Sequence, residues 1–266
     1  MKYFFLSILL SIFLGCSSSD SHPESIIYGK ISKLSEASGI CYVNKNDTLF
    51  VACDNGILYE IDKNGAVLNK KDFSTIKNHD FEGIAYDSKN DLIMVAVEGS
   101  DNVLVLDREL KIIKNINVDR IDSQGRLILQ KDKKEGLEGI SIDSDGKIFL
   151  SNQSFKQLPD SDPSVVFNIT ILDNSSAEID QIFSHGYSNI AGLSFYNGYL
   201  YMVSDSGNLL IKYDYKNNKI IYQHKVTSFS DDIKDISVEG VTFDDDNNIY
   251  FADNKDGQIF KYQFNE

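Results

Sequence analysis

Short apolar runs separated by polar turns recur along almost the whole chain. Five of these runs open with the same phrase, in which a variable residue precedes a glycine and then an aliphatic residue. The five copies begin at Ala37, Phe81, Leu137, Ile190 and Val238. A period of about 50 residues that is filled with short strands is typical of a β-propeller, whose blades are small antiparallel sheets around one axis.

Each repeat contains segments with the polarity of successive blade strands. The first, as in 83–86, is rich in β-branched or aromatic residues, and the second, as in 92–97, is almost wholly apolar. A wholly apolar run suits a strand that is buried on both faces. The third segment alternates, as in 58–62, and the fourth is more polar, as in 112–118. No segment has a sustained helical period, so we expect almost no helix.

The last repeat stops after three strands, the third of which covers 258–264. An open blade edge would leave unpaired backbone groups, and the segment 25–31 belongs to no other blade. The sequence therefore predicts an all-β, five-bladed propeller over residues 25–266, with its ring closed by an N-terminal strand that completes the last blade. The segments 119–135 and 153–164 break the rhythm and are predicted to be loops.

The first 15 residues have a different character. Lys2 precedes an apolar run over 3–14, which is too short to span a bilayer. The run ends in Leu-Gly-Cys at 14–16 and so resembles a bacterial lipoprotein signal. This resemblance implies a signal peptide over 1–15, a lipidated Cys16 and a flexible tether over 16–24, hence an exported, membrane-anchored protein of the cell envelope, in the periplasm or at the outer surface. The alternative is an ordinary secretory signal with Cys16 incidental.

Composition and net charge limit the classes of partner that this protein can bind. A net charge of −14 and a pI of about 4.7 exclude a basic surface for nucleic acid, and they argue against any contact with an anionic membrane other than the lipid anchor. We expect a monomer that binds a small molecule or a protein. Cys41 and Cys53 lie on the first two strands of one blade, where either a disulfide or two buried free thiols would fit.

Acidic residues occupy equivalent positions in several repeats. Glu82, Glu138 and Glu239 begin first strands, with Ser38 and Ala191 in the matching positions. A second row ends the second strands, at Asp54, Glu98, Asn152, Asp205 and Asp253. An antiparallel hairpin places the start of its first strand beside the end of its second. Both rows should therefore surround one mouth of the central channel.

Carboxylates gathered in this way need protons or a cation. Two of them about 5 Å apart repel each other by roughly 3 kcal/mol at an effective dielectric of 20, so either their pKa values rise or a metal neutralises them. Oxygen ligands without His or Cys favour Ca²⁺ first and Mg²⁺ second, and disfavour zinc. A glutamate that merely opens a strand and faces water is the alternative, but three in register favour a metal or ligand site.

The Ser-Gly, Glu-Gly and Ala-Gly strand starts, together with the acidic ends of the second strands and the exported N-terminus, resemble the SdiA-regulated (YjiK-like) family over roughly residues 28–264. The resemblance implies a five-bladed propeller with a calcium site, distantly related to NHL-repeat propellers and without an established activity. It also implies that Glu82, Glu138 and Glu239 are the first ligand candidates, with the second row after them.

Two functions are compatible with this pattern. The leading one is a non-enzymatic propeller that holds Ca²⁺ at its channel mouth and binds a ligand or protein there, beneath the loop 153–164. The alternative is a metal-dependent hydrolase of phosphoesters, lactones or esters, with Glu98, Asp205 or His79 as general base. That alternative rests on analogy with other propellers. The Gly-x-Ser-x-Gly pattern of a serine nucleophile is not met at 139–143 or 192–196.

Overall fold

The computed structural model describes residues 27–76, 79–130, 136–230, 233 and 235–265. The predicted signal peptide, Cys16 and the tether lie outside these residues. Within them, the secondary structure consists of twenty strands and two 3-10 turns of three residues, η1 (Glu98–Ser100) and η2 (Val226–Ser228). The prediction of an all-β fold is confirmed. No helix among the described residues has the length and apolar character needed to cross a membrane.

The strands form four hydrogen-bonded sheets, and within three of them the strands follow chain order or its reverse, apart from the N-terminal strand. One sheet contains β2 (Ala37–Val43), β3 (Thr48–Cys53), β4 (Ile57–Asp62) and β5 (Val67–Asp72). Another contains β14 (Ile190–Tyr196), β15 (Tyr199–Ser204), β16 (Leu209–Asp214) and β17 (Lys219–Lys225). A third has the order β1 (Ile27–Lys33), β20 (Gln258–Gln263), β19 (Asn248–Asp253) and β18 (Val238–Phe243).

The fourth sheet has eight strands, because two antiparallel groups of four are joined edge to edge. The first group is β6 (Phe81–Asp87), β7 (Leu92–Val97), β8 (Asn102–Leu106) and β9 (Ile112–Asp119). The second is β10 (Leu137–Ile142), β11 (Ile148–Asn152), β12 (Val165–Ile171) and β13 (Ser176–Phe183). A short parallel pairing of β13 with β9 connects them. Hydrogen bonding alone therefore does not give the predicted number of five blades.

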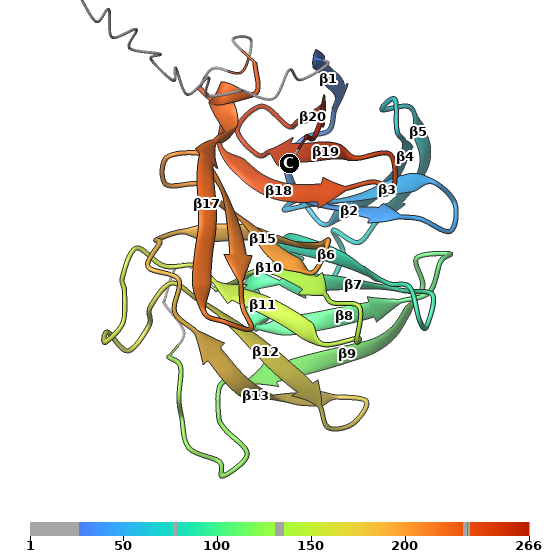
Figure 1. The fold of residues 1–266 in the computed structure, drawn as a ribbon. Helices are drawn as coiled ribbons and strands as arrows, with labels where there is room; N and C mark the ends of the chain where they lie inside the picture. The colour runs from blue at the N-terminus through green and yellow to red at the C-terminus, as the bar shows by residue number, and fades with distance from the viewer. Residues whose placement is uncertain (1–26, 77–78, 131–135, 231–232, 234, 266) are drawn as a thin grey trace, which may run out of the picture.

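The chain closes on itself through its first strand. β1 pairs antiparallel with β20, from Ile27 opposite Tyr262 to Lys33 opposite Gln258, and Figure 1 shows blue β1 beside red β20. The predicted pairing of an N-terminal strand with the last repeat is confirmed. This pairing gives β20 a partner on each side, which an edge strand lacks.

The first strands of the repeats lie together in the middle of the molecule. β2 contacts β6, β6 contacts β10, β10 contacts β14, β14 contacts β18, and β18 returns to β2. The repeated glycines permit this close approach: a Cβ on Gly39 would lie 2.2 Å from the carbonyl oxygen of Glu82, and one on Gly240 would lie 2.5 Å from that of Ser38. The glycine in the repeated phrase is therefore a packing requirement of the inner strands.

Each second strand is sandwiched between its neighbours and supplies much of the core. Every residue of β3, β11 and β19 is buried. The apolar runs within these strands predict this burial, and polar residues at their ends, such as Asn152 and Asp253, are buried as well. Cys41 and Cys53 are both buried and free, so a disulfide between them is wrong. They belong to different apolar clusters, and burial raises the pKa of the Cys41 thiol to about 12.

Candidate metal centre

A β-bulge at the start of each inner strand places its second residue at one mouth of the channel. Register shifts interrupt the pairing after Ala37, Phe81, Leu137, Ile190 and Val238, at the first residue of each repeated phrase. The next residue, which is glutamate in three of the five strands, is thereby released from the regular alternation of the ladder. Bulges re-aim side chains in this way beside functional sites. The repeated phrase thus encodes both the bulge and the side chain that it directs.

Three glutamates from two neighbouring repeats meet at this mouth. Glu82 of β6, Glu138 of β10 and Glu98, the first residue of η1, each place a carboxylate oxygen within 4.8 Å of the other two. Glu82 is 8% exposed and Glu138 is 4% exposed. The structure thus brings together residues of both predicted acidic rows at these three positions.

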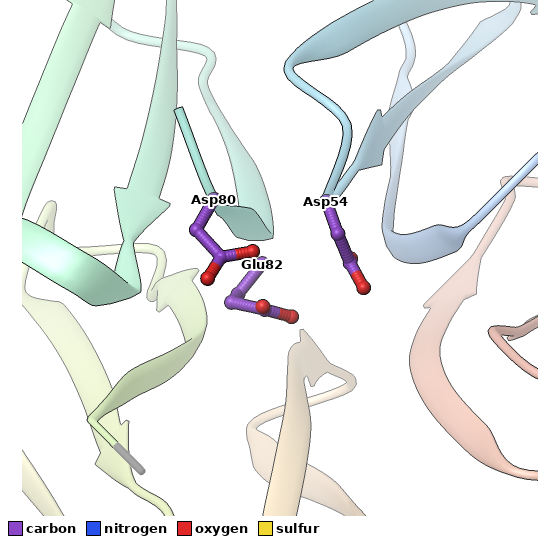
Figure 2. A group of neighbouring side chains, drawn as sticks. All are labelled: Asp54, Asp80 and Glu82. Atoms are coloured by element: carbon purple, nitrogen blue, oxygen red, sulfur yellow. The ribbon is translucent and has the colours of Figure 1, made fainter. Parts of the chain in front are cut away.

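A second acidic group shares Glu82. The carboxylate of Glu82 also lies within 4.8 Å of carboxylate oxygens of Asp54 and Asp80. Figure 2 shows the three side chains converging, with Asp54 reaching across from the end of β3 and the other two from the start of β6. Asp80 was not singled out from the sequence, although it stands two residues before Glu82, in a position that is polar in most repeats. Comparing that position across the repeats would have identified it.

Glu239 joins the same mouth through a hydroxyl group. Ser38, which occupies the glutamate position in β2, donates to Glu239 Oε2 at 2.8 Å and is also hydrogen-bonded to Asp54. The amide of Asn254 donates to Asp54 Oδ2 at 2.7 Å and to the Ser38 hydroxyl at 2.9 Å. Asn254 was not predicted, and these contacts make it part of the network that orients Asp54.

Burial and mutual repulsion hold protons on these groups. Burial, followed by the charges of Asp54 and Glu239, raises the pKa of Glu82 well above its usual range. Burial and the neighbouring Glu82 do the same for Glu138. Burial raises the pKa of Glu239 to about 8, although the Ser38 hydrogen bond opposes the shift. Burial also raises the pKa of Asp54. A bound cation would reverse these shifts, because it favours the charged carboxylates.

Asp205 and Asp253 are held at a neighbouring part of the mouth. Ser237 connects them, since its hydroxyl donates to Asp205 Oδ1 at 2.6 Å and its backbone N–H donates to Asp253 Oδ1 at 2.9 Å. Asn189 donates to the other oxygen of Asp205 at 3.2 Å. Burial raises the pKa of Asp253, and both aspartates act on the pKa of Glu239. They are near the glutamates but belong to neither group of converging carboxylates.

Asn152 departs from the predicted ring. Its side-chain oxygen accepts a hydrogen bond from Arg120 Nη1 at 2.6 Å, and its amide donates to the carbonyl oxygen of Pro163 at 2.8 Å. Arg120 also pairs with Asp101 at 2.9 Å. Asn152 therefore anchors the segment 153–164, and both of its polar ends are occupied. Arg120 lies in a predicted loop 32 residues away, so nothing in the repeat pattern indicated this partner.

His79 and Ala191 also have clear positions. His79 Nδ1 lies 2.9 Å from the carbonyl oxygen of Ile76, and the imidazole packs against Gly56, where an added Cβ would lie 2.8 Å from a ring carbon. Ala191 occupies the second position of β14 and brings no polar group. The segment 153–164 is fixed beside the same mouth, because Ser154 accepts a hydrogen bond from the backbone of Asn189, the residue just before β14.

The chemistry of the two groups is that of a hard-cation site. All ligand atoms that converge are carboxylate oxygens, contributed by Asp54, Asp80, Glu82, Glu98 and Glu138. Their number and spacing fit a divalent cation, and neither group contains the His or Cys that zinc sites usually use. The residues present could hold a metal, and Glu82 is the one that the two groups have in common.

Comparison with solved structures identifies the architecture. The chain resembles glutaminyl cyclase from Myxococcus xanthus with a TM-score of 0.58 and 10% identity, over 90% of this chain and 95% of that one. It also resembles the β-propeller domain of Cps50 (Swd1) from Myceliophteria thermophila, with a TM-score of 0.53 and 9% identity, over 91% of this chain and 100% of that one. Likeness at such identity shows the fold alone, which is a β-propeller.

Comparison of the sequence with curated proteins finds no match. A model of the SdiA-regulated family, however, matches residues 27–256, a span that includes all five repeated phrases and every carboxylate of the two groups. The resemblance carried by the strand starts is thereby confirmed, and the protein belongs to the SdiA-regulated family.

Proposed function

We propose that this protein is an exported propeller that binds a divalent cation, Ca²⁺ in preference to Mg²⁺, at the carboxylate mouth and uses that face as a binding module. The observation that carries the proposal is the position of Glu82. Its carboxylate is almost buried, lies within 4.8 Å of oxygens from four other acidic residues taken over both groups, and has no hydrogen bond or ion pair with any described residue. A carboxylate in such surroundings requires a proton or a cation.

The proposal includes five blades. Five inner strands contact one another in a closed circuit, and the glycine of each strand lies against the backbone of the next strand. The eight-stranded sheet is then two blades whose outer strands touch through the short β9–β13 pairing. This reading gives every blade four strands, with β1 completing the last one.

Calcium suits the geometry better than magnesium. Ca²⁺ accepts six to eight oxygens in a flexible arrangement, whereas Mg²⁺ demands a near-octahedral shell and retains several waters. The two groups of carboxylates, which share Glu82 and come from three separate repeats, supply many oxygens. The N-terminal lipid on Cys16 would hold this module at a membrane surface, and the protein would act there as a monomer.

The surroundings of the three residues predicted as general bases favour a binding role over hydrolysis. Both oxygens of Asp205 accept hydrogen bonds, and His79 packs against Gly56. Glu98 is the only one of the three candidates that belongs to the carboxylate groups. Beside the mouth, the segment 153–164 exposes Phe155 and Leu158, whose side chains offer apolar contacts to a ligand or protein.

Calorimetry of the full chain tests the metal. Calcium chloride should raise the melting temperature relative to chelator by roughly 5–10 °C at a hundredfold excess over Kd, because binding adds about 2.7 kcal/mol and 1 kcal/mol shifts Tm by about 2–4 °C in a protein of this size. The matched control is Glu109→Gln, which removes an exposed carboxylate and should leave the increment unchanged. An identical Tm in chelator and in calcium would contradict the proposal.

Activity assays separate the two functions. The calcium-loaded protein should not turn over phosphate esters, lactones or aryl esters above the buffer rate. Hydrolysis that Glu98→Gln abolishes, without a change in the calcium response of Tm, would replace the binding module with the hydrolase.

A further inference from the structure

The inner strands form a second concavity at the end of the channel opposite the carboxylates. It is an open pocket of about 220 Å³, lined by the later residues of β2, β6, β10, β14 and β18. The residue two positions after each repeated glycine is small in all five strands, namely Cys41, Ala85, Ser141, Ser194 and Thr242, and all five line the pocket. The hollow therefore exists because this position never carries a large side chain.

Three of these small residues bring hydroxyl groups to the pocket. Ser141 is 4% exposed and Ser194 is 9% exposed, and neither hydroxyl has a hydrogen-bond partner among the described residues. Thr242 accepts a hydrogen bond from the backbone N–H of Tyr42 at 3.0 Å, which leaves its own proton available to donate. Neither serine hydroxyl is enclosed by the protein, because both open onto a pocket that solvent can reach. The hydroxyl groups of Ser141, Ser194 and Thr242 are therefore available to bond to a ligand in this pocket.

The walls above these hydroxyls are aromatic and held in place. Tyr42 donates to Asp47 at 2.7 Å, and Tyr86 donates to Asp91 at 2.9 Å. Phe243 stacks on Tyr196 with ring centroids 4.4 Å apart and an interplanar angle of 11°. Rings fixed by such contacts lose little entropy when a ligand binds, so the site is formed in advance.

The charges around the pocket favour a neutral occupant because the buried acid in its lining, Asp244, already accepts hydrogen bonds from Asn248 and Tyr250 and lies 3.9 Å from the ammonium of Lys63. None of the described lining residues is Lys, Arg or His, so an anion has no counter-charge there. A cation gains less than usual from the tyrosines, because the guanidinium of Arg108 already lies 5.6 Å from the centroid of Tyr86 and the ammonium of Lys63 lies 6.0 Å from that of Tyr42. Asp245 and Asn44 at the rim can accept or exchange hydrogen bonds with hydroxyl groups.

We propose that this pocket binds a neutral, polyhydroxylated ring the size of a monosaccharide. The apolar face of such a ring packs on the aromatic walls, while its hydroxyl groups bond to Ser141, Ser194 and Thr242. The pocket volume of about 220 Å³ lies below the roughly 300–1,000 Å³ of sites for drug-sized ligands, so the pocket suits a single ring.

This site is separate from the carboxylate mouth. The aliphatic residues next to the glycines, including Ile40, Ile84 and Ile140, line the middle of the channel, where the free space is only about 10 Å³. That space is about the size of one water molecule. A sugar ring cannot pass it, so the two mouths bind their ligands independently.

Titration of the full chain with glucose, galactose and N-acetylglucosamine tests the proposal, with choline chloride and sodium benzoate as the charged comparators. Ligand-detected NMR and calorimetry should show saturable binding of at least one sugar in the millimolar range or tighter, and none of choline or benzoate. Ser141→Ala/Ser194→Ala should weaken that binding at least about tenfold, because bonds from both hydroxyls are lost. It should leave Tm unchanged, since neither hydroxyl bonds to the protein.

Two further variants keep the test decisive. Ser88→Trp places a large ring at the exposed rim of the pocket and should block the sugar even if the double variant misfolds. Ser228→Ala should bind like the original protein, because Ser228 lies outside the pocket and its hydroxyl donates to the Lys225 carbonyl oxygen. The proposal is overturned if no sugar binds up to tens of millimolar, if a charged comparator binds instead, or if the sugar binds Ser88→Trp unchanged.

Discussion

The two mouths of the channel are built from the same five strands and have opposite chemistry. At one end, Glu82, Glu138 and Glu239 lie at bulges, and burial keeps protons on their carboxyl groups. At the other end, Ser141 and Ser194 face an aromatic pocket that no basic residue lines within the described part of the chain. Only three positions separate Glu138 from Ser141 along β10, which is about 10 Å of strand.

The difference comes from where each strand is regular. The bulge before the glycine frees one side chain from the alternation of the ladder and directs it to the first mouth. After the glycine, normal pairing resumes, and the side chains alternate between the channel and the space between sheets. One short phrase therefore supplies two kinds of site, because an irregular and a regular stretch of strand follow each other.

The largest expected effect comes from replacing one of the inner-strand glycines, which lie between the two mouths. Gly83→Ala places a Cβ 2.4 Å from the carbonyl oxygen of Glu138 and 2.6 Å from the backbone nitrogen of Ile140. Both atoms belong to backbone and cannot move aside, so we expect a loss of about 3 kcal/mol or more and a fall in Tm of about 10 °C. Thermal unfolding followed by circular dichroism measures it.

The matched control is Gly125→Ala, where the φ of +74° strains an alanine but no atom lies within 4 Å of the new Cβ. It should cost about 1 kcal/mol. Equal losses in the two variants would mean that the inner glycines serve backbone conformation and not the approach of the strands.

Glu82→Gln should give the next largest effect, because Glu82 belongs to both acidic groups. We expect the calcium affinity to fall about 100-fold, equivalent to about 2.7 kcal/mol, with no destabilisation of the calcium-free protein, since an amide carries no buried charge. Isothermal titration with calcium chloride measures the affinity, and Glu109→Gln again provides the control. An unchanged calcium affinity would mean that Glu82 does not bind the metal.

A smaller effect is a pH dependence that should appear at the carboxylate mouth and not at the pocket. The carboxyl of Glu239 has a pKa of about 8 in the folded protein against 4.5 ordinarily, so without calcium the folded chain binds more protons than the unfolded chain between these values. Its contribution to stability is therefore complete below about pH 4.5 and is lost as the pH rises through about 8. Calcium bound beside Glu239, at Glu82 and Glu138, would oppose the protons on all three carboxyl groups, whose pKa values are raised. The rise in Tm that calcium causes should therefore grow by several degrees across this window.

Calorimetry at several pH values, with calcium and with chelator, checks this prediction. Sugar binding at the second mouth should stay constant over the same range, because the small floor residues that contact the sugar are not acidic. A calcium increment that shrinks as the pH rises would contradict the raised pKa values.

The repeated phrase made the first mouth predictable and left the second one hidden. A glutamate before glycine is conspicuous, and its recurrence in register located Glu82, Glu138 and Glu239 on their strands. Closure by the N-terminal strand followed from a blade that lacked one strand. Ser141 and Ser194, by contrast, stand within apolar strands where small residues are usual in a core, and only packing shows that a cavity borders them.

The misplaced members of the ring have a different cause. Hairpin symmetry groups Asn152 with the acids because it treats every repeat alike, whereas Arg120 and the Pro163 carbonyl oxygen bind Asn152 through segments that occur once. Asp80 and Asn254 were overlooked because each stands just outside the repeated strand that it serves. Symmetry predicts what the repeats share, and it cannot predict contacts made by single insertions.

The smallest expected effect addresses the independence of the two mouths. Ser141→Ala/Ser194→Ala should change calcium affinity by no more than about 0.5 kcal/mol, because sites about 10 Å apart without shared partners have nearly additive energies. A double-mutant cycle with Glu82→Gln, read by calcium titration and by sugar titration, measures the coupling directly. Coupling above about 1 kcal/mol would mean that the aliphatic residues in the middle of the channel transmit changes between the mouths, and the strands would then act as one site with two openings.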